Sequence, residues 1–299
     1  MRIFPTLFVT ILLFAQCQST ESGQSEEAKK QLVSNKNLTA GAIIDMIKSE
    51  VTCEWREETV DTFKGGKAEQ KVSGIATTFL ATMDVLKKAK ARCINFIITH
   101  ESTFYNHLDQ TEQFEEDAVV AAKKKYIKDN GLVVWRFHDH IHMTEPDGIH
   151  EGVVEDLGWK ENQISKDLLI FQFEEMTLSD LAGQLKRHYG ASSIRVVGNP
   201  EMNFTTAGLV VGSPGSMPQI KMLQRDEVEV LVGGETHEWE TVEYVRDAIS
   251  QGRKKALILV GHANSEEAGM RYCADWLKGF ISGIPIEFIP AGDPFWTPE

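Results

Sequence analysis

Short apolar runs rich in β-branched residues alternate along the chain with longer stretches in which apolar residues recur at helical spacing. Alternation of this kind is typical of an α/β protein with mainly parallel sheets. The strands are predicted at 94–99, 132–137, 168–173, 194–197, 209–211, 228–232, 256–260 and 286–289. The helices are predicted at 39–48, 78–91, 115–130, 178–189, 239–251 and 266–280.

Capping residues set several of the predicted helix ends. Thr39 is placed to cap the first helix, and either Thr177 or Ser179 is placed to cap the helix at 178–189. Ser265 is placed in the same way before the helix at 266–280. Each of these side chains can accept a hydrogen bond from a backbone N–H that the helix itself leaves free.

The first 17 residues have the pattern of an export signal. Arg2 supplies a positive charge, and residues 3–15 are almost wholly apolar but too few to span a bilayer as a stable helix. Cleavage after Cys17 would release a periplasmic or secreted protein, whereas cleavage before it, with lipid on the cysteine, would give a lipoprotein. Gln16 is larger than the residue usual before a lipidated cysteine. An uncleaved anchor or a disordered tail is the third alternative. Residues 18–36 are polar and form a predicted linker.

Composition narrows the classes of partner. The chain has 299 residues, 42% of them hydrophobic and 25% charged, which suits one large domain or two small ones. A net charge of −13 argues against nucleic-acid binding through a broad basic surface, although bound divalent cations would reverse the sign locally. No later segment is long and apolar enough for a stable membrane span. Cys53, Cys93 and Cys273 form neither a disulfide framework nor a CxxC zinc motif.

Four polar clusters directly follow predicted strands. Ligands of α/β proteins bind beyond the carboxyl ends of parallel strands, so we expect these clusters to meet at one site. Five of the nine histidines of the chain lie in three of them. The clusters are Thr99-His100-Glu101-Ser102, His138-Asp139-His140-Ile141-His142, Gly233-Gly234-Glu235-Thr236-His237-Glu238 and Gly261-His262-Ala263-Asn264-Ser265-Glu266.

Imidazole and carboxylate are the usual ligands of divalent first-row metals. If the segment after 132–137 stays extended, His138, His140 and His142 point to one face, because alternate residues of a strand do so. Spacing alone does not say which of the three would bind metal. His262 and Glu266 lie four residues apart and can converge on one point. Glu266 in a first helical turn is also explained by the helix dipole without any metal.

These clusters, from about Leu38 to the C-terminus, resemble the Nif-three-like dinuclear-metal family, which is often described as type-two GTP cyclohydrolase-like. The resemblance implies an α/β fold of two lobes within 37–299, the second at roughly 151–250, with the metal site in the inter-lobe cleft. It also implies a homo-oligomer, because members of that family commonly assemble as hexamers. The motifs that carry it are the apolar strand ending at His100, the segment 138–142, Gly234-Glu235, and Gly261-His262 with Glu266.

The chain departs from the family pattern at two positions. Glu101 stands where the family usually has the second histidine of a pair, and His142 stands where it usually has an aspartate. One exchange offsets the other, so the ligand charge is conserved. The resemblance implies two divalent ions, zinc, iron or manganese, with five ligands: His100, Glu101, His142, His262 and Glu266.

The leading hypothesis is an exported hydrolase of an unknown small molecule that uses a metal-activated hydroxide as nucleophile. Glu235, His138 and His140 are candidates for proton transfer, and Asp139 and His237 are candidates to orient the ligands. GTP is not favoured, because an exported protein meets little of it. The alternative is a metal-binding or assembly protein without turnover. An amidohydrolase-like barrel fits poorly, because its His-x-His motif occurs early on its first strand.

Overall fold

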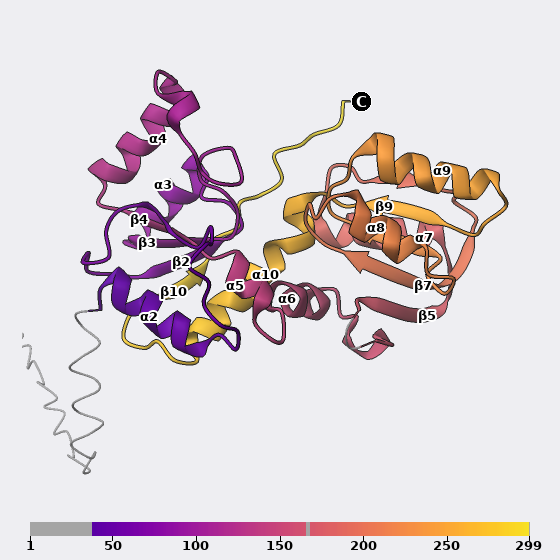
Figure 1. The fold of residues 1–299 in the computed structure, drawn as a ribbon, viewed down its shortest axis with the longest axis horizontal. Coiled ribbons are helices and arrows are strands. Elements are labelled where there is room, and N and C mark those ends of the chain that lie inside the picture. Colours follow the sequence, from indigo (N-terminus) through magenta and orange to yellow (C-terminus); the bar gives the residue numbers. More distant parts are fainter. Residues whose placement is uncertain (1–37, 166–167, 299) are drawn as a thin grey trace, which may run out of the picture.

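The computed structural model describes residues 38–165 and 168–298, so the predicted export signal, the linker and Cys17 lie outside the described residues. The described chain forms two five-stranded sheets with helices around them (Figure 1). No helix among the described residues is both long enough and apolar enough to cross a membrane. The prediction of an α/β fold with mainly parallel sheets is confirmed.

The first sheet has the strand order β1-β4-β3-β2-β10, in which β1 is antiparallel to β4 and the other pairs are parallel. Every residue of β2, β3 and β4 is buried, as expected for strands covered on both faces. The strands are β1 (Phe63–Gly65), β2 (Ile75–Thr78), β3 (Phe96–Thr99), β4 (Val133–Arg136) and β10 (Ile286–Phe288). The helices before and between them are α2 (Ala40–Glu50), α3 (Met83–Ala91) and α4 (Ala118–Asp129).

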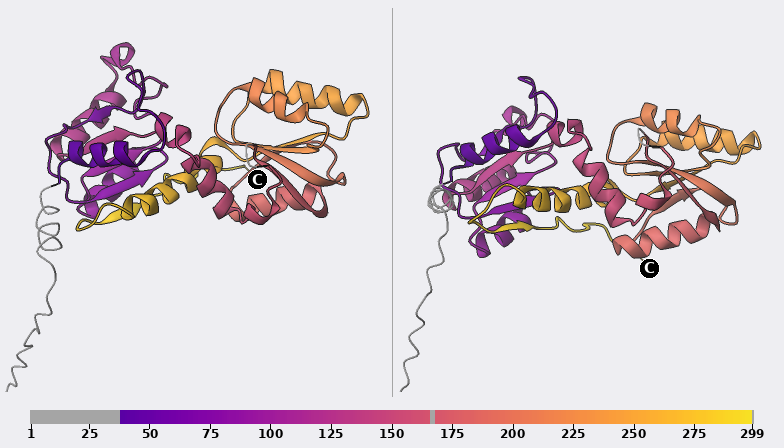
Figure 2. Two further views of the ribbon diagram at one scale, coloured as in Figure 1. Left: turned by 60° about the horizontal axis from the view of Figure 1, so that its bottom comes forward. Right: turned by 90° about the horizontal axis from the view of Figure 1, so that it is seen from below.

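The second sheet has the order β5-β7-β8-β9-β6, with a parallel centre and an antiparallel strand at each edge. Helix α7 covers one face, and α8 and α9 cover the other (Figure 2). The strands are β5 (Ile170–Thr177), β6 (Arg195–Val197), β7 (Asn203–Val210), β8 (Val230–Gly233) and β9 (Ala256–Leu259). The helices are α7 (Leu178–Tyr189), α8 (Ser216–Leu223), α9 (Glu243–Ser250) and a π-helical turn at Glu238–Val242.

Two helices connect the sheets. Helix α6 (Gly148–Asp156) leads out of the first sheet, and α10 (His262–Lys278) follows β9 of the second and returns to β10 of the first. They pack closely because each has a glycine at the contact. A Cβ atom on Gly152 would lie 2.7 Å from the Cα atom of Gly269, and one on Gly269 would lie 2.5 Å from the Cα atom of Ile149.

Most predicted elements are present, with shifted ends. Thr39 caps α2 by accepting a hydrogen bond from the Ala42 amide, and Thr177 rather than Ser179 caps α7. The predicted start of the helix at 78–91 is wrong, because Thr78 ends the buried strand β2 and the helix begins after Thr82. Ser265 is not a cap: α10 begins four residues earlier, after Gly261. The sequence patterns missed β1, β2, α6, α8 and the short helix α5 (Asp139–Met143).

Candidate metal centre

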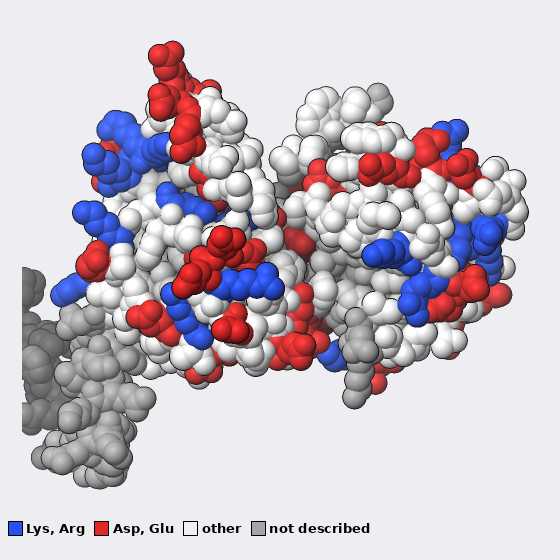
Figure 3. Space-filling view, viewed as in Figure 1, with Lys and Arg blue, Asp and Glu red and all other residues white. Residues whose placement is uncertain are grey.

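The polar clusters meet in one open cavity of about 1700 Å³. Its lining includes residues that follow strands of both sheets, such as Glu101 after β3 and Glu235 after β8. His138 and His142 come from α5, and His262 and Glu266 come from the first turns of α10. Figure 3 shows acidic side chains within the recess near the middle of the molecule. The carboxyl ends of parallel strands therefore build the site, as the sequence predicts.

His100, which follows β3, is completely buried beside the cavity. Its Nδ1 atom lies 3.3 Å from the carbonyl oxygen of Phe137, which fixes the ring and leaves the Nε2 lone pair facing the site. Nε2 makes no hydrogen bond, and the nearest carboxylate oxygen, on Glu266, is 3.4 Å away. Burial lowers the pKa of His100 and outweighs the opposing effect of Glu266. A buried nitrogen without a partner costs about 1–3 kcal/mol, so the group needs a ligand.

Glu266 and His262 lie one helical turn apart on α10. The His262 Nε2 atom is 3.0 Å from the Glu266 Oε2 atom, and the Glu266 side chain is almost wholly buried. Burial raises the pKa of this carboxyl, but the neighbouring imidazoles of His100 and His262 hold it well below its usual range. Gly212 makes room for the carboxylate, because a Cβ atom there would lie 2.0 Å from the Glu266 Oε1 atom.

Glu101 lies between two imidazoles. Its Oε1 atom is 3.5 Å from the Nε2 atoms of both His138 and His262. Its Oε2 atom accepts hydrogen bonds from Arg136 at 2.9 Å and from the Ser102 amide at 3.1 Å. Burial raises the pKa of Glu101, but the hydrogen bond from His138 and the nearby positive charges outweigh it and lower the pKa to about 2.

Arg136 is a site residue that the sequence patterns did not single out. Its guanidinium is fully buried at the end of β4, where it also donates to the His100 carbonyl oxygen at 3.0 Å. It thus fixes the backbone of one candidate ligand and the carboxylate of the next. The sequence did hold a signal for Arg136, because it is a charged residue at the end of an otherwise apolar strand. Such a residue is expected to be buried with a partner, since buried charges in proteins are paired.

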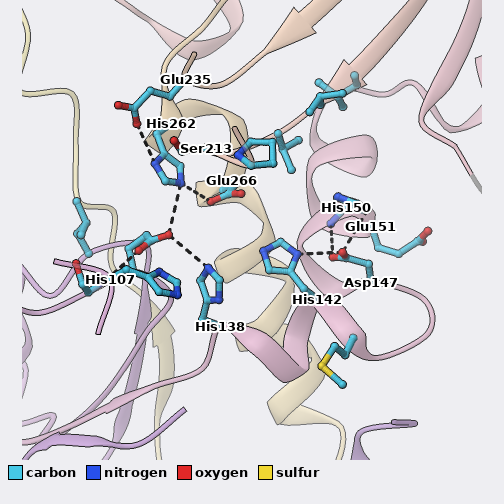
Figure 4. A pocket seen from close by; sticks show the side chains of 18 of the residues that line it. His107, His138, His142, Asp147, His150, Glu151, Ser213, Glu235, His262 and Glu266 are labelled. Carbon is cyan, nitrogen blue, oxygen red and sulfur yellow. Dashed lines mark hydrogen bonds and ion pairs between the residues drawn. The ribbon is translucent and has the colours of Figure 1, made fainter. Parts of the chain in front are cut away.

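His138 is held on both sides by carboxylates. Its Nδ1 atom is 2.9 Å from Asp139, and its Nε2 atom faces Glu101 (Figure 4). Burial lowers the pKa of His138, but the hydrogen bonds to the two carboxylates outweigh it and raise the pKa to about 9. Asp139 is itself fixed by Thr59 Oγ1 at 2.7 Å and by the Val60 amide at 3.1 Å, so it can orient the imidazole.

His140 points away from the cavity, and the expectation that three alternate histidines share a face is wrong. The segment is the helix α5, not a strand, so His138 and His142, four residues apart, face the same way and His140 does not. The His140 Nδ1 atom lies 2.6 Å from Asp61 Oδ2, and its Nε2 atom accepts a hydrogen bond from the Arg56 amide at 2.9 Å. Both nitrogens are thus used, which removes the geometric basis for a catalytic role.

His142 joins the site from the second turn of α5. Its ring centroid lies 5.0 Å from that of His100 and 5.3 Å from that of His138. Its Nδ1 atom is 3.0 Å from Asp147 Oδ2, a partner that the sequence patterns also missed. The carboxylate of Asp147 thus supports the imidazole that stands where the family pattern has an acid.

The two remaining candidates differ in position. Glu235 lies beside the cluster, with its Oε2 atom 3.3 Å from the His262 Nδ1 atom and its side chain more than half exposed. His237 lies outside the cluster: it pairs with Glu240 at 3.1 Å and stacks on the exposed ring of Trp239. These contacts link His237 to Glu240 and Trp239 rather than to a described candidate ligand.

The donor set suits divalent metals. Among the described residues, three groups of three side chains have ligand atoms within 4.8 Å of one another, and two of these groups contain His100. The first comprises His100, His138 and His142, and the second comprises His100, Glu101 and Glu266. The donor atoms are imidazole nitrogens and carboxylate oxygens, and one of them, His100 Nε2, is buried without a hydrogen-bond partner. A donor set of this kind fits zinc, iron or manganese.

A family model described as Duf34/NIF3 (NGG1p interacting factor 3) matches residues 40–294, which is most of the chain. The chain belongs to this family. A Clostridium acetobutylicum protein named GTP cyclohydrolase 1 type 2 homolog is 26% identical over 232 residues, covering 74% of this chain and 82% of that protein.

Several solved structures share the fold. A Bacillus cereus protein related to NIF3 superposes with a TM-score of 0.69 at 14% identity, covering 87% of this chain and 99% of that one. The hypothetical protein SA1388 of Staphylococcus aureus gives 0.67 at 15% identity with the same coverage. Reduced HcgD from Methanocaldococcus jannaschii gives 0.59 at 15% identity, covering 84% and 98%.

Proposed function

We propose that the protein is a metal-dependent hydrolase whose two divalent ions are held by His100, Glu101, His142, His262 and Glu266. The observation that carries the proposal is the buried Nε2 atom of His100, which has no hydrogen-bond partner and belongs to two of the three ligand groups. Ions held there would lower the pKa of a bound water to supply a nucleophile at neutral pH, and would polarise the scissile bond.

Side chains around the ligands supply the proton transfers. His138 lines the cavity, and its contacts with Glu101 and Asp139 favour the protonated ring, so we assign it the donation of a proton to the leaving group. The Glu235 Oε2 atom lies 3.3 Å from the His262 Nδ1 atom, a position from which the carboxylate would hold the ring so that its Nε2 atom can serve as a ligand. Because Glu235 is largely exposed, it can also exchange protons with solvent.

The open cavity favours turnover over the rival function of metal storage or assembly. Structural metal sites are usually closed by protein ligands, whereas catalytic sites keep positions for water and substrate. A cavity of about 1700 Å³ is larger than the usual small-molecule site, so a substrate has room beside the ligands.

The charge of the cavity argues against a polyphosphate substrate. Among the described residues, the lining contains one basic side chain of lysine or arginine type, Lys123, and six carboxylates. The cavity therefore offers a single ammonium or guanidinium side chain to bind the successive charges of a polyphosphate. The GTP in the name of the Clostridium relative belongs to that protein, and we propose an ester, amide or simple phosphate here.

The test is to strip the mature chain of metal, reload it with zinc, iron or manganese, and measure bound metal and hydrolysis of an ester, amide and phosphate panel. We expect the double variant H142A/E266A to lose metal and turnover together. The control H188A removes a histidine that pairs with Asp156 away from the cavity and should change neither. Fewer than one bound ion per wild-type chain would overturn the proposal, and tight metal binding without turnover on any substrate would support the non-catalytic rival.

We also propose export to the periplasm or the medium, with or without lipid on Cys17, and assembly into a homo-oligomer. The support is the apolar segment 3–15 for export and the family resemblance for assembly. Cell fractionation with a Cys17→Ser comparison tests the first, and light scattering of the purified chain tests the second.

A further inference from the structure

Three further ligand atoms converge beside the candidate metal centre, where α5 gives way to α6. Asp147 caps α6 through its Oδ1 atom, which accepts hydrogen bonds from the Ile149 and His150 amides at 2.9 and 3.0 Å. That leaves Oδ2 facing two imidazoles: it is 3.0 Å from the His142 Nδ1 atom and 3.3 Å from the His150 Nδ1 atom (Figure 4).

The local contacts leave this group free to take a cation. Asp147 and His150 meet as an ion pair without hydrogen-bond geometry, so hydrogen bonding does not fix the His150 side chain there. The neighbouring acid Glu151 is already neutralised, because both of its oxygens accept from Lys160 at 2.7 and 2.8 Å. All three donors line the large cavity, so positions opposite them are open to water or substrate.

We propose that His142, Asp147 and His150 form an additional divalent-cation site beside the two-metal site proposed above, with which it shares His142. Their ligand atoms lie within 4.8 Å of one another, and two imidazoles with one carboxylate are a common set for zinc and iron with open coordination positions. Neither Asp147 nor His150 lies in the motifs that identify the family.

His142 joins this site to the His100 group. Its Nδ1 atom faces Asp147, which leaves Nε2 for the group that contains His100 and His138. The two nitrogens of His142 thus face the two groups, so this side chain is shared between them. The extra cation would then lie at the wall of the cavity, where it could bind an anionic or electron-rich part of a substrate.

The test is a zinc and cobalt titration of the full mature chain after removal of metal, with bound metal counted by elemental analysis and affinities measured by chelator competition. We expect His150→Asn and His150→Gln to bind one ion fewer than the wild type. The matched control His188→Asn removes a histidine from another His–Asp pair and should bind as many ions as the wild type. In H262N/E266Q, which disrupts the proposed two-metal site, one ion should remain and should disappear when H150N is added.

Equal stoichiometry and affinity in the wild type and both His150 variants would overturn the extra site, and Asp147 would then only orient His142. This result is distinct from failure of the proposed function. If H262N/E266Q keeps every ion of the wild type while H150N loses one, the extra site stands and the two-metal site falls.

Discussion

The Arg136 guanidinium donates to the Glu101 carboxylate at 2.9 Å, from a position that is completely buried. The same side chain donates to the carbonyl oxygen of His100, so one cation positions two consecutive candidate ligands. Removal of one partner of a buried pair leaves an uncompensated charge and typically costs about 3–5 kcal/mol. Arg136 therefore contributes both to the stability of the fold and to the geometry of the candidate metal centre.

Arg136→Met should lower the free energy of unfolding by about 3–5 kcal/mol and weaken metal binding about 10–100-fold. The loss arises because Glu101 keeps its charge without its cation. Urea unfolding and metal competition measure the two effects. The control Arg246→Met breaks an exposed pair with Glu243 and should cost less than about 1 kcal/mol. Unchanged metal affinity in R136M would show that Arg136 only stabilises the fold.

Gly212→Ala should displace the Glu266 carboxylate. Gly212 has φ +67°, and a Cβ atom there would lie 2.0 Å from the Glu266 Oε1 atom. The matched control is Gly252→Ala, which has φ +77° but no atom within 4 Å of the added Cβ. The control bears only the backbone cost of about 1–2 kcal/mol, and G212A should lose stability beyond that and lose metal affinity. Equal effects of the two substitutions would contradict the contact.

In the metal-free protein, Glu101 should make stability fall at acid pH and His138 should make it fall at alkaline pH. The folded pKa of Glu101, about 2, is below its ordinary value of 4.5, so its stabilisation is full above pH 4.5 and is lost as the pH falls towards 2. The folded pKa of His138, about 9, is above 6.5, so its stabilisation is full below pH 6.5 and is lost as the pH rises through 9.

Urea unfolding of the metal-free protein in chelator from pH 2 to 10 measures both the acid and the alkaline loss of stability. Glu101→Gln should flatten the acid limb and His138→Gln the alkaline one; a profile unchanged by either substitution would argue against the pairing.

His140 and His142 should separate stability from metal binding, although they lie two residues apart on α5. His140 is buried, stacked on Trp55 with ring centroids 3.6 Å apart, and hydrogen-bonded at both nitrogens. His140→Ala should therefore cost about 2–4 kcal/mol of stability, because Asp61 and the Arg56 amide lose their partner. Its metal content should stay at the wild-type value. His142→Ala should show the reverse, and metal loss in H140A at full stability would contradict the assignment.

The position of the site could be predicted from the sequence, because the physics involved is local. Apolar runs of strand length mark β3, β4, β8 and β9, and the residue after each strand must lie at the sheet edge. Glu101, Glu235 and His262 therefore line the cavity there, and the buried His100 contacts Glu266 beside them. The family motif and the i,i+4 spacing of His262 and Glu266 add to this, and α10 places the two side chains 3.0 Å apart.

Only the tertiary structure decided which neighbours support the ligands. The segment 138–142 is polar enough for a loop and short enough for a strand, and packing of Ile141 and His140 makes it a helix, which turns His140 inward. Asp61, Arg136 and Asp147 are distant from one another in sequence, and no spacing rule predicts that a buried imidazole or carboxylate will find them. Local sequence fixes which side chains lie at the end of a strand, because backbone geometry sets their direction. Long-range packing fixes their partners, because burial makes each unpaired polar group costly and selects the fold that satisfies it.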